Sequence, residues 1–365
     1  MSVAYRFGVP AFLGSALAAF ALGSLAQAQE LPNINIITPG DKSCGQFPKW
    51  TGTILGFYED SGVKVTTLSA ETTVPYVAFL QNGDADLVML DSSQVLQAVS
   101  TGLPIKVVYE AYNYSPEGIV VPADSPIQSI ADLKDATIGM ASDRDLITTV
   151  IAFDSIGETL EGMNVKTVVV GESGPVLAAA LRDKTIAAFS GGSGDRAGIE
   201  AAGLAIRNIT PPEVSRNPGN SLAAWGPTLE EKRDIISKFL RGWSMAQHAG
   251  VVDTMATAAA CRTKNPQQFE NLDAGLRLIN TQVYVGQLRR TKYYGELQPD
   301  VWTDIQGPLL KMGEITQTYD PATFLDPSFI EAANSWDLDE VKAGIKKWKE
   351  ANPDKLVKGF RPINP

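Results

Sequence analysis

The chain has 365 residues, 44% of them hydrophobic, and a formal net charge of −10 at pH 7. This length is enough for two domains with substantial hydrophobic cores. Because a nucleic-acid-binding surface needs clustered Lys and Arg to neutralise phosphates, so acidic a chain argues against nucleic acid as a partner.

The first 28 residues resemble a secretory signal peptide. Arg6 precedes a small and apolar run over residues 7–25, and Ala26-Gln27-Ala28 fits the small-x-small cleavage pattern. A membrane anchor is the alternative, but a run so rich in Ala, Gly and Ser falls short of the roughly 20 strongly apolar residues of a stable span. We therefore expect cleavage after Ala28 and a mature chain in the periplasm.

The chain then alternates short β-rich runs with amphipathic segments. Strands that alternate with helices favour right-handed crossovers and a largely parallel sheet. The expected strands are residues 33–38, 63–68, 87–90 and 105–109, and the expected helices are residues 46–61, 75–82 and 92–100.

The same alternation restarts further along, before long helical segments take over. The second block has expected strands at residues 136–140, 165–170 and 186–189, and expected helices at residues 146–155, 175–182 and 194–202. The later helical segments are residues 229–261, 266–279, 299–312 and 337–351.

This organisation predicts two α/β domains. Residues 29–121 and 221–365 would form the first, which the C-terminal helices coat, and residues 122–220 would form the second. Because the chain would cross between the domains twice, we expect a hinge that closes on a ligand.

Several stretches resemble one known family. They are residues 56–65 (GFYEDSGVKV), 79–87 (FLQNGDADL), 102–108 (GLPIKVV) and 118–140 (GIVVPADSPIQSIADLKDATIGM). Together they are similar to the periplasmic substrate-binding proteins of ABC transporters for thiamine pyrimidines, sulfonates, taurine and nitrate. The resemblance implies a bilobed type II periplasmic-binding-protein fold and an ABC transporter permease as partner.

The chain departs from that family in two loops. Many relatives carry a tryptophan and an acid after the third strand of the second domain, where this chain has SGGSGD at residues 190–195. The first loop, residues 38–43, also lacks the tryptophan common there. The identity of the ligand therefore does not carry over.

Polar residues directly follow two predicted strands. Ligands of open α/β sheets bind at the carboxyl ends of strands, so Asp91, Ser92 and Ser93 are candidate ligand residues, although an N-cap alone explains such residues. In the second domain Ser142 and Arg144 have the matching place. Arg144 could hold a carboxylate or sulfonate, or it could form an internal ion pair.

Two further groups are candidates for the ligand site. Gly191 and Ser193 belong to a Gly-rich loop whose backbone can approach a ligand closely. Tyr112, Tyr114 and Trp225 follow the fourth strand or lie at the return crossing, where they could stack on a ligand or pack the hinge.

The charges leave the ligand class open between two kinds. Helix N-termini and Arg144 suit an anionic carboxylate or sulfonate, which we expect. Amines or pyrimidines would instead suit the acids Asp41, Asp91, Asp143 and Asp195.

We expect no enzyme, cofactor or metal. The single histidine, His248, has no Ser-His-Asp or Cys-His arrangement around it, and thiamine-pyrimidine synthases use a cysteine-rich iron motif that is missing here. The two cysteines, Cys44 and Cys261, can pair in an oxidising compartment or remain buried thiols, and we expect a disulfide.

The sequence thus predicts a monomeric periplasmic protein that captures a small molecule and delivers it to an ABC importer. A subunit that senses the ligand for a membrane receptor is the alternative from another class, and a binder of thiamine-precursor pyrimidines is the alternative ligand assignment.

Overall fold

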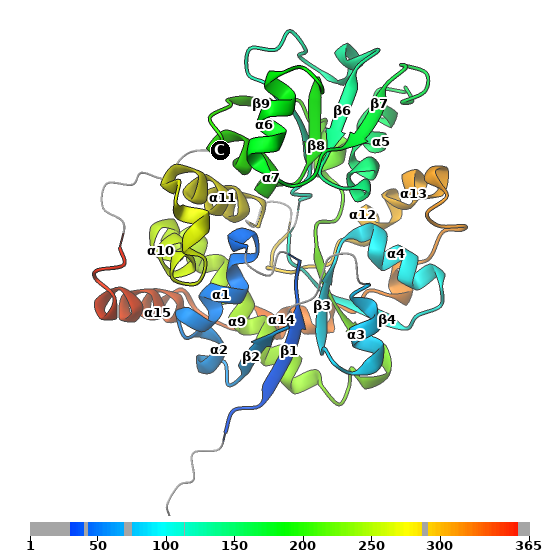
Figure 1. Cartoon of the computed structure of the whole chain (residues 1–365). Coiled ribbons are helices and arrows are strands. Elements are labelled where there is room, and N and C mark those ends of the chain that lie inside the picture. The colour runs from blue at the N-terminus through cyan, green and yellow to red at the C-terminus, as the bar shows by residue number, and fades with distance from the viewer. Residues whose placement is uncertain (1–29, 40–42, 69–74, 113, 287–290, 357–365) are drawn as a thin grey trace, which may run out of the picture. The chain divides into compact units, whose positions relative to one another are not determined.

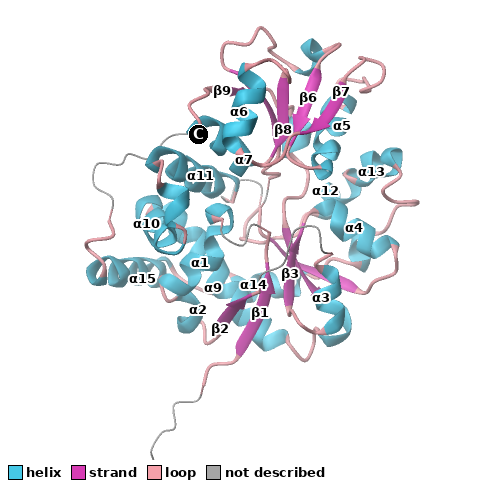
Figure 2. Cartoon of the chain, viewed as in Figure 1, coloured by secondary structure: helices cyan, strands magenta, loops and turns pink. Residues whose placement is uncertain are grey.

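The computed structural model describes residues 30–39, 43–68, 75–112, 114–286 and 291–356. The predicted signal peptide and Asp41 lie outside these residues. Within them the strands form two five-stranded sheets (Figures 1 and 2). The first has the order β2-β1-β3-β10-β4 and the second β7-β6-β8-β5-β9. The predicted α/β fold class is therefore confirmed.

The strand bounds agree with most predicted strands and add three others. The first sheet contains β1 (Asn33–Ile37), β2 (Lys64–Thr67), β3 (Leu87–Leu90), β4 (Ile105–Glu110) and β10 (Ser221–Trp225). The second contains β5 (Gly118–Pro122), β6 (Thr137–Met140), β7 (Lys166–Val169), β8 (Ala188–Gly191) and β9 (Ile206–Asn208). The additions are β5, β9 and β10.

Each sheet contains one strand that runs against its neighbours. Strand β10 pairs antiparallel with β3 and β4, and β5 pairs antiparallel with β8 and β9. The expectation of a largely parallel sheet therefore needs this correction. In both sheets the antiparallel strand is the one by which the chain arrives from the other sheet. The expectation missed it because a residue pattern does not indicate the direction of a strand.

The chain changes sheet twice, as predicted. It leaves the first sheet after β4 and enters the second at β5, then returns between β9 and β10. The exact domain boundaries remain a prediction, because a change of sheet marks a crossing and not the limit of a domain.

Helices fill the connections between strands. In the first block they are α1 (Phe47–Ile54), α2 (Phe57–Asp60), α3 (Val77–Asn82) and α4 (Ser92–Ser100), and in the second α5 (Leu146–Asp154), α6 (Gly174–Arg182), α7 (Ser193–Ala201) and α8 (Pro212–Ser215). The single helix expected over residues 46–61 is two helices. Gly56 separates them with φ +85°, a left-handed conformation that ends a right-handed helix.

The C-terminal part is helical, as expected, but in shorter pieces. It contains α9 (Arg233–Val252), α10 (Thr254–Lys264), α11 (Leu272–Val285), α12 (Pro299–Asp304), α13 (Gln306–Met312), α14 (Ile330–Ala333) and α15 (Leu338–Ala351). Helix α9 packs on α1 and α2, with the ring of Tyr58 stacked on Phe239 at 5.3 Å between centroids.

These C-terminal helices contact more than the first sheet. Helix α11 packs along α7 of the second block. Asn271 Nδ2 donates to the Ala201 carbonyl at 3.2 Å, and Arg277 forms an ion pair with Glu200 at 3.9 Å. The C-terminal helices therefore support both sheets.

A buried carboxyl fixes the segment before α12. Glu110, at the end of β4, is 1% exposed and accepts hydrogen bonds from the Gln298 N–H and Trp302 Nε1, both at 2.8 Å. Burial raises the pKa of Glu110 to about 7.

Among the described residues, no helix is long and apolar enough to cross a membrane.

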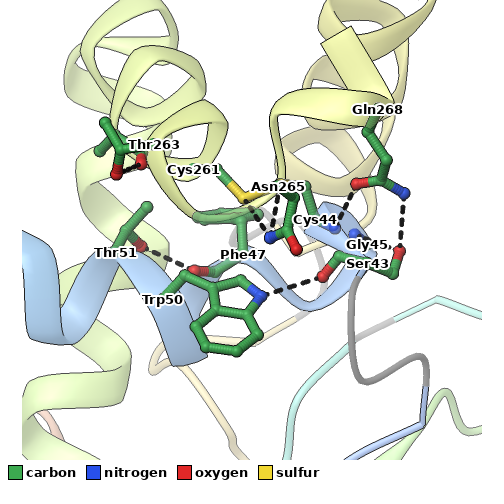
Figure 3. The surroundings of a disulfide bond; sticks show 11 residues. Ser43, Cys44, Gly45, Phe47, Trp50, Thr51, Cys261, Thr263, Asn265 and Gln268 are labelled. Atoms are coloured by element: carbon green, nitrogen blue, oxygen red, sulfur yellow. Dashed lines mark hydrogen bonds between the residues drawn. A yellow bond between two sulfur atoms is a disulfide. The ribbon is translucent and has the colours of Figure 1, made fainter.

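A disulfide joins Cys44 and Cys261, whose Cα atoms are 6.1 Å apart (Figure 3). It links the 3₁₀ turn before α1 to α10. Around it, Asn265 Nδ2 lies 3.5 Å from Cys44 Sγ, and the Gln268 side chain accepts from the Cys44 N–H at 2.7 Å and donates to Ser43 Oγ at 3.3 Å. The turn before α1 is therefore tied to the C-terminal helices.

Removing this disulfide should lower stability strongly. The bridge closes a loop with a sequence separation of 217, for which the chain-entropy model gives about 5 kcal/mol. We expect the double variant Cys44→Ser/Cys261→Ser to lose most of that free energy of unfolding in urea titrations. Thiol titration of the unfolded wild type without reductant should find no reactive thiol. Two reactive thiols per chain would contradict the bridge.

Candidate functional site

The end of β3 forms a capped turn into α4. The Asp91 side chain accepts from the Gln94 N–H at 2.8 Å, and Gln94 Oε1 accepts in return from the Asp91 N–H at 3.1 Å. This reciprocal arrangement satisfies two N–H groups that a helix N-terminus otherwise leaves unpaired. Ser92 is buried and Ser93 half-buried in the first turn. Asp91 is therefore the N-cap of α4, which was the structural alternative to ligand binding.

The end of β6 uses the same device. Asp145 Oδ2 accepts from the Ser142 N–H at 2.7 Å and from Ser142 Oγ at 3.2 Å. The Ser190 hydroxyl, on neighbouring β8, donates to the Asp145 carbonyl at 3.4 Å. The turns that follow β6 and β8 are therefore held side by side.

The end of β8 requires glycine. A Cβ on Gly191 would lie 2.5 Å from the Phe189 ring, and the next N–H, of Gly192, donates to Asp195 Oδ2 at 3.1 Å. Ser193 begins α7, is 4% exposed and accepts a hydrogen bond from Gln282 Nε2 of α11. Gly191 thus lets the backbone of this loop lie close to the Phe189 ring, and Ser193 ties the loop to α11.

An ion pair joins the strand ends of the two sheets. Arg144 Nη1, in the turn after β6, lies 3.5 Å from Asp91 Oδ2, at the start of α4. The side chains are 47% and 30% exposed, so water screens the pair and it stabilises only modestly. The predicted site residues after β3 and those after β6 are therefore brought together. Arg144 forms an internal ion pair, which was the alternative to ligand binding.

The predicted aromatic residues lie in three different places. Tyr112 is 3% exposed, and its hydroxyl is 2.7 Å from both the Gly45 carbonyl and Gln46 Oε1, which favours packing. Tyr114 borders a cavity described below. Trp225 was expected near the ends of the parallel strands. It pairs instead with Ile105, the first residue of β4, at the other end of the first sheet's strands. The antiparallel direction of β10 explains this misplacement, and we propose no ligand role for Trp225.

A cavity of about 550 Å³ lies next to these strand ends. We call it the hinge cavity, because both crossings line it together with α7 and α11. Its lining includes Tyr114 and Glu117 from the first crossing, Thr210 from the second, Ser193 and Arg196 from α7, and Arg277 from α11. This volume lies within the usual range for small-molecule sites.

Glu117 and Arg196 were not among the predicted site residues. Both enter the site only through tertiary contacts. Arg196 Nη2 donates to the Pro116 carbonyl at 2.7 Å, which ties α7 to the first crossing. A Glu in a connecting segment and an Arg inside a helix carry no local signal, so only the fold could reveal them.

Several acidic groups gather around the strand ends and the hinge cavity. Burial and then Asp145 raise the pKa of Glu117 to about 8, and burial and then Glu172 raise the pKa of Asp195 to about 7. Burial also raises the pKa values of Asp91 and Asp145. Burial is the first cause of each shift, and the neighbouring carboxyl groups add to it for Glu117 and Asp195.

No group of metal-ligating side chains occurs in the part of the chain that the structure describes. The Nδ1 atom of His248 is 2.9 Å from Tyr294 Oη, and burial lowers the pKa of this histidine. Its ring also lies 5.0 Å from that of Trp336, between centroids. These contacts indicate a packing role for His248.

The family model "NMT1/THI5 like" matches residues 48–251, which is more than half of the chain. The chain belongs to this family. Among curated proteins, it is 24% identical over 213 residues to the riboflavin-binding protein RibY of Chloroflexus aurantiacus. That match spans 57% of this chain and 58% of RibY, so it covers little more than half of either protein.

Solved structures share the fold at low identity. The periplasmic aliphatic sulphonate binding protein SsuA of Escherichia coli matches with a TM-score of 0.61 and 14% identity, over 82% of this chain and 94% of SsuA. The desulfurization enzyme DSZB matches with a TM-score of 0.55 and 13% identity, over 83% and 98%. These likenesses confirm the expected type II periplasmic-binding-protein fold, which therefore serves both a binding protein and an enzyme.

Two substitutions at Asp91 should separate its cap from its ion pair. Asn also caps helices, so Asp91→Asn removes mainly the pair with Arg144 and should cost less than about 1 kcal/mol of unfolding free energy. Asp91→Ala removes both interactions and should cost about 1–2 kcal/mol. Urea unfolding at pH 7 measures both values. Equal losses in the two variants would show that the ion pair dominates.

Proposed function

We propose that this chain is the solute-binding protein of an ABC importer and that it holds a small molecule between its two sheets. The observation that carries this proposal is the meeting of the strand ends across the Asp91–Arg144 pair, next to a cavity of about 550 Å³ that both crossings line. Membership of the NMT1/THI5-like family supports it, as does the fold shared with SsuA.

The proposed place of action is the periplasm. The signal-peptide pattern of the first 28 residues predicts export, and the Cys44–Cys261 disulfide suits an oxidising compartment. In this proposal the partner is the permease of the importer, and the protein acts as a monomer.

The charges favour a ligand with nitrogen donors over the anion expected from the sequence. An anion would have to compete with Asp91 for Arg144 and would lie near Glu117 and Asp195, whose raised pKa values reflect an unfavourable setting for negative charge. RibY is named for riboflavin, a nitrogen heterocycle, whereas SsuA is named for sulphonates. We therefore place uncharged or cationic nitrogen compounds first and sulfonates second.

Binding is also favoured over catalysis, although DSZB shares the fold. Both cysteines form the disulfide, and His248 contacts Tyr294 at a distance from the hinge cavity lining. Among the described residues that line the cavity, none is a cysteine or a histidine, so no Cys–His or Ser–His pair is formed by its lining.

A ligand screen tests the function. Thermal unfolding should shift upward with at least one compound among riboflavin, aminopyrimidines, alkanesulfonates and organic acids, since a ligand at 100 times its Kd stabilises by about 2.7 kcal/mol. Thr281→Trp, which fills the hinge cavity from α11, should abolish that shift. Thr303→Trp, at an exposed position of α12, should retain it. A shift that survives Thr281→Trp would place the ligand elsewhere.

Ligand binding should also close the two sheets onto each other. Contacts between them, such as Arg144–Asp91 and Lys311–Asp154, form only when they are close and would stabilise a closed state. We expect the radius of gyration from small-angle scattering to decrease when the ligand found in the screen is added. An unchanged radius would indicate a receptor that is already closed without ligand.

A further inference from the structure

Two residues of the hinge cavity have buried polar atoms without partners. Glu117 Oε2 and Arg196 Nε are both inaccessible to water and make no hydrogen bond within the described residues. Leaving such an atom unpaired destabilises the folded protein, and more so when the group is charged. A buried polar group without a partner in a native protein calls for an explanation, such as a catalytic role or a bound water or ion.

The surroundings hold Arg196 in place. Its Nη2 donates to the Pro116 carbonyl, and its Nη1 lies only 2.9 Å from where a Cβ of Gly118 would be. Glycine at the first position of β5 therefore makes room for the guanidinium. Arg196 is thereby placed directly beside the crossing that carries Glu117.

Glu117 is surrounded mainly by other acids. The charged groups that act on it are Asp145 from the turn after β6, Asp195 and Arg196 from α7, and Asp91 from the start of α4. Further along the cavity, Arg277 of α11 is paired with Glu200 of α7. Arg196 is therefore the basic group that partly compensates the charge of Glu117. A ligand with a positive or hydrogen-donating group would compensate the rest.

We propose that the Glu117 carboxylate accepts a hydrogen bond from an N–H group of the ligand, such as an amino, amidine or ring N–H group, while Arg196 compensates the carboxylate charge. This inference rests on the proposed function and adds the residue that sets its specificity. An anionic ligand without N–H groups would leave Glu117 without its donor. Glu117 thus selects for nitrogen compounds.

Ligand binding at Glu117 should be coupled to proton release. In the ligand-free protein Glu117 is mostly protonated at pH 7, because its pKa is raised to about 8. An N–H donor favours the ionised carboxylate, so binding should release about one proton at pH 7. Affinity should therefore rise between pH 6 and pH 8, whereas an anion at the same place would bind better as the pH falls.

The test compares Glu117→Gln with wild type, and Glu161→Gln serves as an exposed control of the same chemistry. The probes are riboflavin and 4-aminopyrimidine, which carry N–H donors, and ethanesulfonate, which carries none. Calorimetry at pH 7 in two buffers of different protonation enthalpy gives affinity and proton release together. We expect an N–H probe to bind wild type and Glu161→Gln equally with proton release. Glu117→Gln should bind it at least tenfold more weakly and release no proton.

Thermal unfolding without ligand shows that the variants are folded. The inference is wrong if an N–H probe binds Glu117→Gln as tightly as wild type, or if wild type binds only ethanesulfonate. It is equally wrong, with the proposed function intact, if none of the three probes binds but another compound of the wider screen does. If no compound in the wider screen stabilises wild type, the proposed function itself fails.

Discussion

The direction of one strand in each sheet determines where the site can be. Because β5 and β10 run against their neighbours, each begins at the edge where the other strands end: Gly118 lies opposite Gly191, and Ser221 lies opposite both Leu90 and Glu110. Both crossings therefore lie beside the strand ends. A molecule bound there contacts the very segments whose dihedral angles set the position of one sheet relative to the other, so binding and hinge motion are coupled by topology alone.

The strand ends are built mainly from carboxyl groups that serve as caps. Asp91 and Asp145 each hold the turn that follows a strand, and Asp195 accepts the N–H of Gly192. Such caps fix loop geometry, but they gather negative charge at one place, which burial makes costly. Arg144 and Arg196 offset part of that charge. Because Glu117 and Asp195 have pKa values raised to about 8 and about 7, the charge of the site should change with pH near neutrality.

The sequence revealed the positions of strand ends but not the tertiary contacts between them. Asp91 and Ser142 were found because a polar residue after a β-rich run is a local pattern, and the two cysteines because there are only two. Trp225 was misplaced because a residue pattern gives no strand direction. Glu117 was missed because the groups that surround it, such as Asp145 and Arg196, come from distant parts of the chain.

The helices that follow β10 do more than cover the first sheet. Helix α10 is joined through Cys261 to the turn before α1, and α11 lies along α7 of the second block through Asn271, Arg277 and Gln282. Opening must therefore either separate α11 from α7 or carry α11 along with the second sheet. In the first case the Gln282–Ser193 hydrogen bond breaks at the wall of the hinge cavity, which would open that cavity to solvent. Either way, α11 adds a link between the two blocks to the two chain crossings.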